Sequence, residues 1–368
     1  LGRVTTVFFT AFEPSGDRHA APVVAELRRR HPEWRLLAAA GPFTQQAGAE
    51  LVAETASAGV MGLEAARRMR ELPALVEQLQ KHWPDQGPVV HIPVDSPAAQ
   101  FQITPAFRSR GAKTVHWVAP KIWARRWDGR LPKLRRQTDG LACLFPFEAD
   151  WFSSRGLPAT FVGHPSFSRA IEATPTPGLP ETEHRVAILP GSRSQEIRDN
   201  LPLMLDVMDR LRSEMEVSGV IVAADPRAAK QIDSLNQSRY PVRTGDIDGV
   251  LAWSSFAFAV SGTVTLDVAR HRRPGLGIYA CGWAFRMIAK MLIRGMVLPP
   301  NLVLGREAMP ELAPIPIDPR FVLEAVRTLL NDDQALRAQV EAWDELHKMY
   351  EGHDPGAGVA DLVEGVLE

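Results

Sequence analysis

The feature that most constrains the fold is a repeated alternation of short apolar runs with helical patterns. It occupies residues 5–162 and, after an interruption, starts again at residue 186. Strands that alternate with helices favour a parallel, doubly wound sheet. The interruption contains Pro175-Thr176-Pro177-Gly178-Leu179-Pro180, and three prolines so close together disfavour both helix and sheet. We therefore predict an α/β protein with two doubly wound, Rossmann-like domains that face a central cleft.

The predicted boundaries follow from this alternation. We expect an N-terminal domain over residues 1–165, a Pro-rich linker over 166–184, a second domain over 185–345 and a C-terminal helical segment over 346–368. The apolar runs predict strands at residues 5–12, 36–40, 89–94, 114–118, 141–144, 160–162, 186–189, 220–223, 256–260 and 275–279. In such sheets ligands bind beyond the carboxyl ends of the strands, so functional residues are expected just after a strand.

Composition limits the class of protein. The 368 residues are 45% hydrophobic and 23% charged, which is typical of a globular protein, and a net charge of -1 gives no overall attraction for nucleic acid. Cys143 and Cys281 lie far apart in apolar surroundings, which indicates buried free thiols rather than a disulfide or a metal site. The first residues lack the pattern of a signal peptide, and no apolar run approaches the length of a membrane span. These features predict a cytoplasmic protein.

Two carboxylates are candidate general bases in the first half. Glu13 lies in Phe12-Glu13-Pro14-Ser15-Gly16-Asp17, directly after the first predicted strand and before a helix. Asp95 follows the strand at residues 89–94, where a carboxylate is well placed to accept a proton. Each segment also has a purely structural reading. Asp17 would then be a helix N-cap, and Asp95 would form a turn next to a proline.

The second half begins with a candidate anion site. Gly191, Ser192 and Arg193 follow its first predicted strand, and Gly191 lets the chain turn close to a ligand. The guanidinium of Arg193 is planar and permanently charged, so it suits phosphate oxygens, and Glu196 would hold it in place. The alternative is a capping turn with a surface Arg–Glu pair, which contributes at most about 1 kcal/mol.

A second candidate phosphate site follows the strand at residues 256–260. Ser261, Gly262 and Thr263 lead into a helix whose free N–H groups and dipole favour a pyrophosphate. Asp267, one turn further on, would accept hydrogen bonds from a ribose. The alternative is an ordinary N-capped helix.

Together these segments resemble the lipid-A-disaccharide synthases, a family of two-domain glycosyltransferases of the GT-B type. The resemblance covers nearly the whole chain. The matching segments occur in the same order and at similar spacing: Phe12 to Asp17, Val60-Met61-Gly62, Asp95 with Pro97, Pro120 with Trp123 and Ala124, Phe145-Pro146-Phe147-Glu148, Gly163-His164-Pro165, Leu189 to Arg193, Ser261-Gly262-Thr263, Pro300-Asn301-Leu302 and Gly305-Arg306-Glu307. So many ordered matches are far more specific than any one of them.

The resemblance implies a reaction. A UDP-2,3-diacylglucosamine donor would transfer its sugar to 2,3-diacylglucosamine 1-phosphate (lipid X), forming the β-1,6-linked lipid A disaccharide phosphate and UDP with inversion at the anomeric carbon. Asp95, or in second place Glu13, would take the hydroxyl proton. The reaction would need no metal and no cofactor. The residues expected to bind the UDP-sugar are Gly191, Ser192, Arg193, Glu196, Ser261, Gly262, Thr263, Asp267 and Asn301.

Three departures from the family pattern fall mainly on the acceptor side. Ala11 and Phe12 replace a small residue and a glycine, and the bulky Phe12 ring is expected to crowd the cleft entrance. Residues 98–100 read Ala-Ala-Gln where the family has Asp-Phe-Asn, which removes a second carboxylate. Asp267 stands where the family has Glu. These changes leave the UDP side largely intact and suggest a divergent member.

Two further features have competing readings. Asp246-Ile247-Asp248 matches the D-x-D pattern of metal-dependent glycosyltransferases, but its place between glycines and before a helical stretch favours capping or a turn. His164 is a conceivable catalytic base, although its position near the domain boundary favours a packing or hinge role.

A membrane-facing surface is predicted at residues 283–294, from Trp283 to Arg294. Its basic residues recur every four positions beside a broad apolar surface, which is typical of an interfacial helix on anionic lipid. The alternative is a core helix whose cations reach solvent. Trp123, Arg125, Arg126 and Trp127 form a similar cluster. We therefore expect peripheral association with the cytoplasmic face of the inner membrane.

Two other functions remain open on the sequence alone. One is an enzyme like UDP-N-acetylglucosamine 2-epimerase. Such an enzyme shares a two-domain architecture but does not need the basic stripe, beside an apolar surface, at residues 283–294. The other is a non-catalytic, membrane-associated nucleotide-sugar-binding paralogue, which the changes at residues 98–100 suggest. The family resemblance also suggests a homodimer.

Overall fold

The chain forms two compact units. The computed structural model describes residues 4–56, 63–124, 129–171, 174–281, 295–315 and 318–368. Unit 1 consists of Leu1–Ser168 together with Gly352–Glu368, and unit 2 of Arg169–Glu351. The division between them falls inside the predicted linker, and the chain returns to unit 1 at its end.

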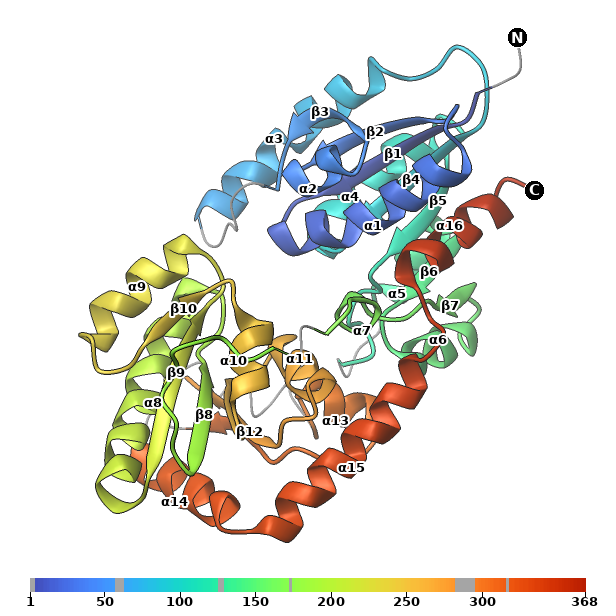
Figure 1. The fold of residues 1–368 in the computed structure, drawn as a ribbon. Helices are drawn as coiled ribbons and strands as arrows, with labels where there is room; N and C mark the ends of the chain where they lie inside the picture. The colour runs from blue at the N-terminus through green and yellow to red at the C-terminus, as the bar shows by residue number, and fades with distance from the viewer. Residues whose placement is uncertain (1–3, 57–62, 125–128, 172–173, 282–294, 316–317) are drawn as a thin grey trace. The chain divides into compact units, whose positions relative to one another are not determined.

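The described part of unit 1 contains a seven-stranded parallel sheet in the order β3-β2-β1-β4-β5-β6-β7 (Figure 1). Its strands are β1 (Thr6–Ala11), β2 (Arg35–Ala40), β3 (Glu50–Glu54), β4 (Val89–Val94), β5 (Lys113–Trp117), β6 (Gly140–Cys143) and β7 (Ala159–Phe161). The helices are α1 (Pro14–Arg30), α2 (Pro42–Gln46), α3 (Leu63–Gln80), α4 (Pro97–Arg108), α5 (Leu131–Gln137), α6 (Pro146–Ser153), α7 (Pro165–Ser168) and α16 (Pro355–Gly365).

The two central strands of this sheet are buried on both faces. Every residue of β1 and β4 is buried, as expected for parallel strands that helices cover on either side. Helices α1, α2 and α16 form one layer, and α3, α4 and α5 form the other. An apolar cluster that includes Phe8, Leu37 and Phe107 fills the space under the second layer.

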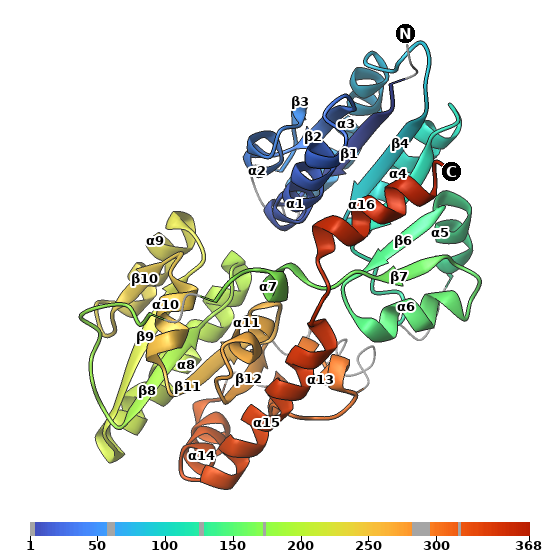
Figure 2. The same cartoon turned by 45° about the vertical axis from the view of Figure 1, so that its right-hand side comes forward.

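The last helix of the chain, α16, is part of unit 1. It packs beside α1 and over β5 and β6 (Figure 2). Arg30 of α1 forms ion pairs with Asp361 at 2.6 Å and Glu364 at 3.1 Å. A Cβ on Gly358 would come within 2.8 Å of the Val162 side chain, so this glycine permits close packing. The C-terminal residues are therefore integral to the first unit.

The described part of unit 2 contains a six-stranded parallel sheet in the order β10-β9-β8-β11-β12-β13. Its strands are β8 (His184–Leu189), β9 (Val217–Ala223), β10 (Val242–Thr244), β11 (Phe256–Val260), β12 (Gly275–Ala280) and β13 (Glu311–Ile315). The helices are α8 (Ser194–Glu214), α9 (Pro226–Asn236), α10 (Ile247–Trp253), α11 (Val264–Arg270), α13 (Pro299–Leu304), α14 (Pro319–Leu330) and α15 (Asp333–Tyr350). The predicted pair of parallel α/β domains is thus confirmed.

The Pro-rich segment packs along unit 2. Thr176 donates a hydrogen bond from its hydroxyl to Asp246 at 2.5 Å, and its backbone N–H bonds to the carbonyl of Gly249 at 3.3 Å. The indole of Trp253 donates to the carbonyl of Pro180 at 3.0 Å. The part of the predicted linker from Thr176 to Pro180 is therefore held against α10 at both of its ends.

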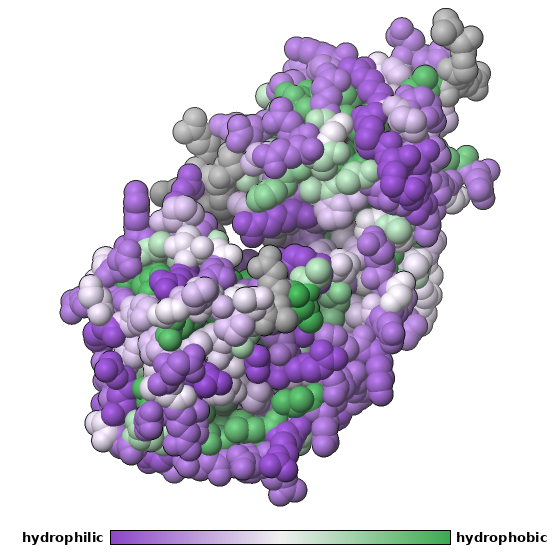
Figure 3. All heavy atoms as spheres, viewed as in Figure 1, coloured by the Kyte–Doolittle hydropathy of each residue, from purple (hydrophilic) through white to green (hydrophobic). Residues whose placement is uncertain are grey.

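Hydrophilic side chains dominate the face drawn in Figure 3. Among the described residues, the large hydrophobic side chains that are exposed are Val4, Phe43, Ile171 and Phe321. Cys143 and Cys281 are both buried, and no disulfide joins them in the part of the chain that the structure describes. None of the helices in the described segments is long and apolar enough to cross a membrane.

Candidate functional site

In each unit, the predicted site residues follow the two strands at which the strand order reverses. Glu13 follows β1 and Asp95 follows β4, and these two strands pair in parallel up to Ala11 and Val94. In unit 2, Gly191 follows β8 and Ser261 follows β11, which also pair directly. Ligands of open α/β sheets bind at this switch point. The topology therefore places each group of candidate residues at the expected edge of its sheet.

Gly16 brings α1 close to this edge in unit 1. A Cβ at this position would lie 3.3 Å from the Cβ of Ala11 and 3.4 Å from the carbonyl oxygen of Val94. Both contacts are with the last residues of the central strands, so the glycine allows α1 to begin directly over their carboxyl ends. Glu13, the residue before α1, is held there as a consequence.

The backbone around Asp95 is strained. Asp95 and Ser96 have φ values of 51° and 47°, and Val118, after the neighbouring strand β5, has a φ of 70°. Residues other than glycine rarely adopt this left-handed backbone conformation, and each residue held in it costs about 1–3 kcal/mol. Such strain gathers at functional sites. The Ser96 hydroxyl lies 3.5 Å from a carboxylate oxygen of Glu13, so the turn after β4 meets the start of α1.

Asp17, the last residue of the first motif, has a structural role. Its buried carboxylate accepts hydrogen bonds from the backbone N–H groups of Gly41, Phe43 and Thr44, at 2.9–3.0 Å. It therefore satisfies the free N–H groups at the start of α2 rather than capping its own helix. The expected capping function is correct in kind, but it serves a different helix.

The departures at residues 98–100 have separate structural consequences. Gln100 is fully buried, and its amide donates to the carbonyls of Thr10 and Val94 while its oxygen accepts from the Thr10 hydroxyl. It thus joins the ends of β1 and β4. Ala98 is exposed on the first turn of α4. The position of the missing carboxylate is therefore open to solvent, whereas the glutamine supports the sheet.

Phe12 does not behave as expected. Its side chain is partly buried and packs against the apolar cluster that contains Phe8 and Phe107. Because the ring contributes to the core of unit 1, the prediction that it crowds the entrance to the site is wrong.

The loop after β8 in unit 2 is built around Gly191 and Glu196. Gly191 has a φ of 96°, and a Cβ there would lie 2.7 Å from a carboxylate oxygen of Glu196. That carboxylate pairs with the Arg193 guanidinium at 2.7 Å and accepts from the Arg193 backbone N–H at 3.3 Å. The Arg193 side chain is 61% exposed, and Ser192 is also exposed. Glu196 therefore fixes an arginine that remains accessible.

The loop after β11 is open around Gly262 as far as the described residues are concerned. The backbone N–H of Ser261 bonds to the carbonyl of Ile278, while a Cβ on Gly262 would meet no atom of those residues within 4 Å. Thr263 is exposed. The Thr265 hydroxyl donates to the Gly262 carbonyl at 2.8 Å and fixes the loop. The predicted phosphate loop is thus rigid at its ends and open at its centre.

Two predicted donor-binding residues have other partners. Asp267 lies 3.6 Å from the Arg169 guanidinium and 3.8 Å from that of Arg270. Asn301 is fully buried; its amide nitrogen donates to Met309 and Glu311, and its oxygen accepts from the N–H groups of Ala308 and Met309. We correct the assignment of Asn301, because these four bonds use its amide to hold the chain before β13.

The D-x-D aspartates are also engaged within unit 2. Asp246 accepts from Thr176. Asp248 pairs with Arg270 and lies 2.8 Å from the Nε2 atom of His271. Their partners support the structural reading of this triplet.

Glu148 is a notable residue for which the sequence suggested no individual role. It is buried and accepts from the Trp123 indole at 3.0 Å and the Phe145 backbone N–H at 3.2 Å. Burial raises the pKa of its carboxyl to about 7. A glutamate three residues after the N-cap is the capping-box pattern, which could have signalled its contact with Phe145.

Several sequence predictions lie outside the described residues. These include the stripe at residues 283–294, the Val60-Met61-Gly62 step, and Arg125, Arg126 and Trp127 of the second aromatic–basic cluster. His164, in contrast, is one of the described residues. Its side chain is buried, and its Nδ1 atom accepts a hydrogen bond from the Ser166 backbone N–H at 3.1 Å. Burial lowers its pKa to about 3, which agrees with a packing role.

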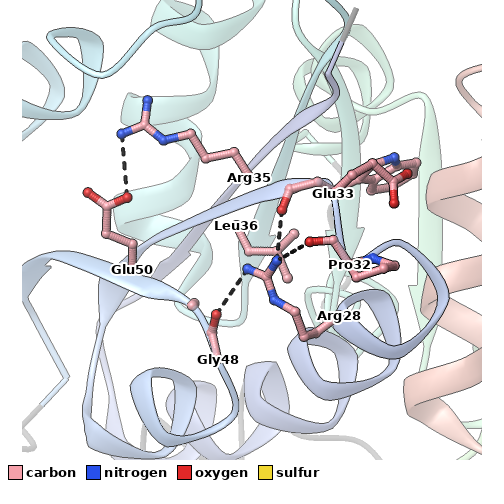
Figure 4. Close-up of a pocket in the computed structure, with 9 residues that line it drawn as sticks. Arg28, Pro32, Glu33, Arg35, Leu36, Gly48 and Glu50 are labelled. Carbon is pink, nitrogen blue, oxygen red and sulfur yellow. Dashed lines mark hydrogen bonds and ion pairs between the residues drawn. The ribbon is translucent and has the colours of Figure 1, made fainter. Parts of the chain in front are cut away.

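A surface hollow of about 550 Å³ in unit 1 lies away from these residues (Figure 4). Its wall includes Arg35 and Glu50, the first residues of β2 and β3, so it is at the amino edge of the sheet. The Arg28 guanidinium there donates to the carbonyls of Pro32, Trp34 and Gly48. These bonds fix the turn before β2, and we assign the hollow no part in the reaction.

Comparison with known proteins decides the family. The profile of the family described as lipid-A-disaccharide synthetase matches residues 7–357. The chain belongs to the lipid-A-disaccharide synthase family. The lipid-A-disaccharide synthase of Anaeromyxobacter dehalogenans is 32% identical, over 98% of this chain and 97% of the relative. That of Pseudomonas paraeruginosa is also 32% identical, over 98% of each. The chain is accordingly a glycosyltransferase of lipid A disaccharide formation, which sets aside the non-catalytic reading.

Solved structures agree on the fold. The S. aureus MnaA–UDP co-structure is similar with a TM-score of 0.65 at 13% identity, covering 100% of this chain and 97% of that one. The glycotransferase of kitacinnamycin gives a TM-score of 0.65 at 15% identity, covering 99% of both chains. A putative UDP-N-acetylglucosamine 2-epimerase from Listeria monocytogenes gives 0.61 at 11% identity. At these identities the likeness establishes the GT-B fold alone.

Proposed function

We propose that the enzyme transfers 2,3-diacylglucosamine from its UDP derivative to the 6-hydroxyl of 2,3-diacylglucosamine 1-phosphate, with inversion at the anomeric carbon. The observation that carries this proposal is the placement of carboxylates at the switch point of one sheet and an accessible arginine at that of the other. Family membership supplies the reaction class, and the site residues supply the roles.

Asp95 is the proposed general base. It is partly exposed, it follows a central strand, and its backbone is held in a strained conformation beside Glu13. The attacking hydroxyl loses its proton to the Asp95 carboxylate as its oxygen bonds to the anomeric carbon and the bond to the UDP oxygen breaks. Help from a positioned base is typically worth about 10²–10⁴-fold in rate. Glu13 lies close enough to Ser96 to steady the same turn.

Arg193 and the Ser261-Gly262-Thr263 loop are proposed to stabilise the departing UDP. Charge develops on the β-phosphate as the sugar leaves, and a preorganised guanidinium with backbone N–H groups lowers the energy of that charge. Glu196 holds Arg193 in a fixed orientation before the donor arrives. Several proteins of similar fold have been solved with UDP, among them S. aureus MnaA and Anabaena Alr3699/HepE, which supports a uridine diphosphate as the nucleotide part of the donor.

Acylated substrates also need access to lipid. We propose that residues 283–294 contact the cytoplasmic face of the inner membrane, since their sequence combines a basic stripe with an apolar surface. We also propose that the enzyme forms a homodimer, as the family resemblance suggests.

The deciding experiment mixes the purified enzyme with both acylated sugars and measures UDP release together with disaccharide formation. The Asp95→Asn variant should lose most turnover and retain UDP binding by calorimetry. Asp85→Asn, which changes an exposed carboxylate elsewhere in unit 1, is the matched control and should behave as the unchanged enzyme. Loss of UDP binding in the Asp95 variant, or full turnover, would remove Asp95 from the role of base.

A further inference from the structure

His19 is a titratable residue of unit 1 to which the reaction described so far assigns no role. His19 lies on α1, six residues after Glu13, and is partly buried. Its ring meets the Trp117 ring edge-on, with centroids 5.8 Å apart, and the His164 ring at 6.2 Å. Its Nδ1 atom is buried and has no hydrogen-bond partner among the described residues.

Trp117 joins His19 to the Asp95 turn. The backbone N–H of Asp95 donates to the Trp117 carbonyl at 3.0 Å, and the Trp117 indole donates to the His19 carbonyl at 2.9 Å. Trp117 is fully buried at the end of β5. Trp117 therefore forms hydrogen bonds to the main chain of both residues, which places the part of α1 that carries His19 beside the turn that carries Asp95.

The charges around His19 decide its protonation. Burial lowers its pKa, the Asp95 carboxylate raises it, and the guanidinium of Arg18 lowers it. His164, which faces it from the end of β7, is uncharged at neutral pH because burial depresses its own pKa to about 3. Burial thus favours the neutral form of His19, and the Asp95 carboxylate acts against burial by favouring the protonated form.

Other buried histidines of unit 1 also have a ring nitrogen without a partner among the described residues, namely Nδ1 of His91 and Nε2 of His116 and His164. Their surroundings differ, because His91 bonds to the Thr10 hydroxyl at 2.9 Å and stacks on Phe107, and the Nδ1 atom of His164 accepts a backbone N–H. The negative charge that acts on His19 is the proposed base itself. Packing alone does not require an imidazole next to that carboxylate.

We propose that His19 is the proton-relay partner of Asp95. This inference rests on the proposed function. The hydroxyl proton passes first to the Asp95 carboxylate and then, directly or through a water, to the neutral imidazole. The imidazolium formed is stabilised by the restored carboxylate and releases its proton to solvent before the next turnover. His19 acts through Asp95 and is a positioning and relay residue. It is therefore not expected to bind the UDP-sugar, whose proposed binding residues belong to unit 2.

The first test is the His19→Gln variant, assayed across pH. We expect kcat to fall at least roughly tenfold, with an unchanged KM for the UDP-sugar. The loss should be smaller than the about 10²–10⁴-fold effect of removing a positioned base, because Asp95 is still present. We also expect the acid limb of the kcat profile to move to lower pH, because the variant no longer contains the imidazole whose protonation blocks the relay. His164→Gln is the matched control, and its profile should match that of the unchanged enzyme.

Chemical rescue provides a second measurement. In His19→Ala, added imidazole should restore turnover, and the restored rate should rise with the neutral fraction of the imidazole. A purely structural role predicts no such dependence. If neither variant folds, as judged by thermal unfolding, Trp117→Phe removes the bond to the His19 carbonyl while keeping a ring. It should lower kcat and shift the acid limb in the same direction.

The outcomes separate the two proposals. An inactive Asp95→Asn enzyme together with a His19→Gln enzyme of normal kcat and normal pH profile would overturn the relay and leave Asp95 as the base. An active Asp95→Asn enzyme would overturn the proposed base itself. A reduced kcat in His19→Gln with an unshifted acid limb and no imidazole rescue would assign His19 a packing role, against our inference.

Discussion

The guanidinium of Arg270 lies buried against the carboxylate of Asp248, and the two residues belong to neighbouring helices of unit 2. The Arg270 side chain is only 1% exposed. Arg270 also donates to the carbonyls of Arg169 and Ala170 at 3.3 and 3.2 Å. Its own carbonyl lies 2.9 Å from the Nε2 atom of His347 on α15. One buried ion pair thus ties the first residues of unit 2 to its core and to its last helix.

This arrangement predicts a large loss of stability in Asp248→Asn. The substitution leaves a buried guanidinium without its main counter-charge, and removing one partner of a buried pair typically costs about 3–5 kcal/mol. Denaturant unfolding should show this decrease. Asp206→Asn is the control, because its pair with Arg210 is exposed and should contribute less than about 1 kcal/mol. Equal effects of the two substitutions would contradict the prediction.

Chelation provides a test of the D-x-D triplet. Asp246 is bonded to Thr176 and Asp248 to Arg270, so a divalent cation would have to displace existing partners. We expect EDTA to leave the rate of UDP release unchanged. A loss of activity that added Mg²⁺ restores would return these aspartates to the donor site.

If Arg193 has the role proposed above, Arg193→Ala should reduce turnover at least roughly tenfold, because a preorganised charge that stabilises the departing UDP is lost. The free energy of unfolding should change little, since the Arg193–Glu196 pair is largely exposed on the arginine side. Glu196→Gln should have a smaller effect on turnover, as it loosens the arginine without removing its charge. Arg210→Ala serves as a control far from the loop. Normal turnover in Arg193→Ala would exclude this residue from the site.

Glu148 predicts a pH dependence of stability. Its folded-state pKa is raised from 4.5 to about 7, so between these values the folded protein binds more protons than the unfolded chain. Its contribution is therefore present at low pH and is lost as pH rises through about 7. Unfolding measured from pH 5 to pH 8 should show the stability of Glu148→Gln improving relative to the unchanged enzyme as pH increases. A difference that is independent of pH would mean that Glu148 is ionised throughout.

Much of the fold could be predicted because its central strands are apolar on both faces. The strands at residues 89–94 and 256–260 have the predicted bounds, and all their residues are buried. The edge strands β3, β10 and β13 were missed, since all of their residues except Ile315 are half-buried or exposed. The return of α16 to unit 1 was also missed, because an amphipathic pattern does not specify which unit a helix contacts.

The positions of the candidate site residues could be predicted where backbone topology alone determines them. Glu13, Asp95, Gly191 and Ser261 follow central strands, and any doubly wound sheet brings such positions to its switch point. Asn301 could not be assigned correctly, because its role depends on buried partners distant from the strand ends. The same applies to Phe12, whose orientation is set by packing against Phe8 and Phe107 rather than by the motif it belongs to.

The return of α16 also determines the order in which the polypeptide can complete its folding during synthesis. Unit 2 is one continuous stretch, Arg169–Glu351, whereas unit 1 needs Gly352–Glu368 to cover α1 and the strands β5 and β6. A nascent chain therefore emerges from the ribosome with β5 and β6 of its first sheet not yet covered by α16, and the second unit can close before the first. A chain that ends before α16 would leave exposed the surface of unit 1 that this helix covers. We expect such a chain to aggregate during expression.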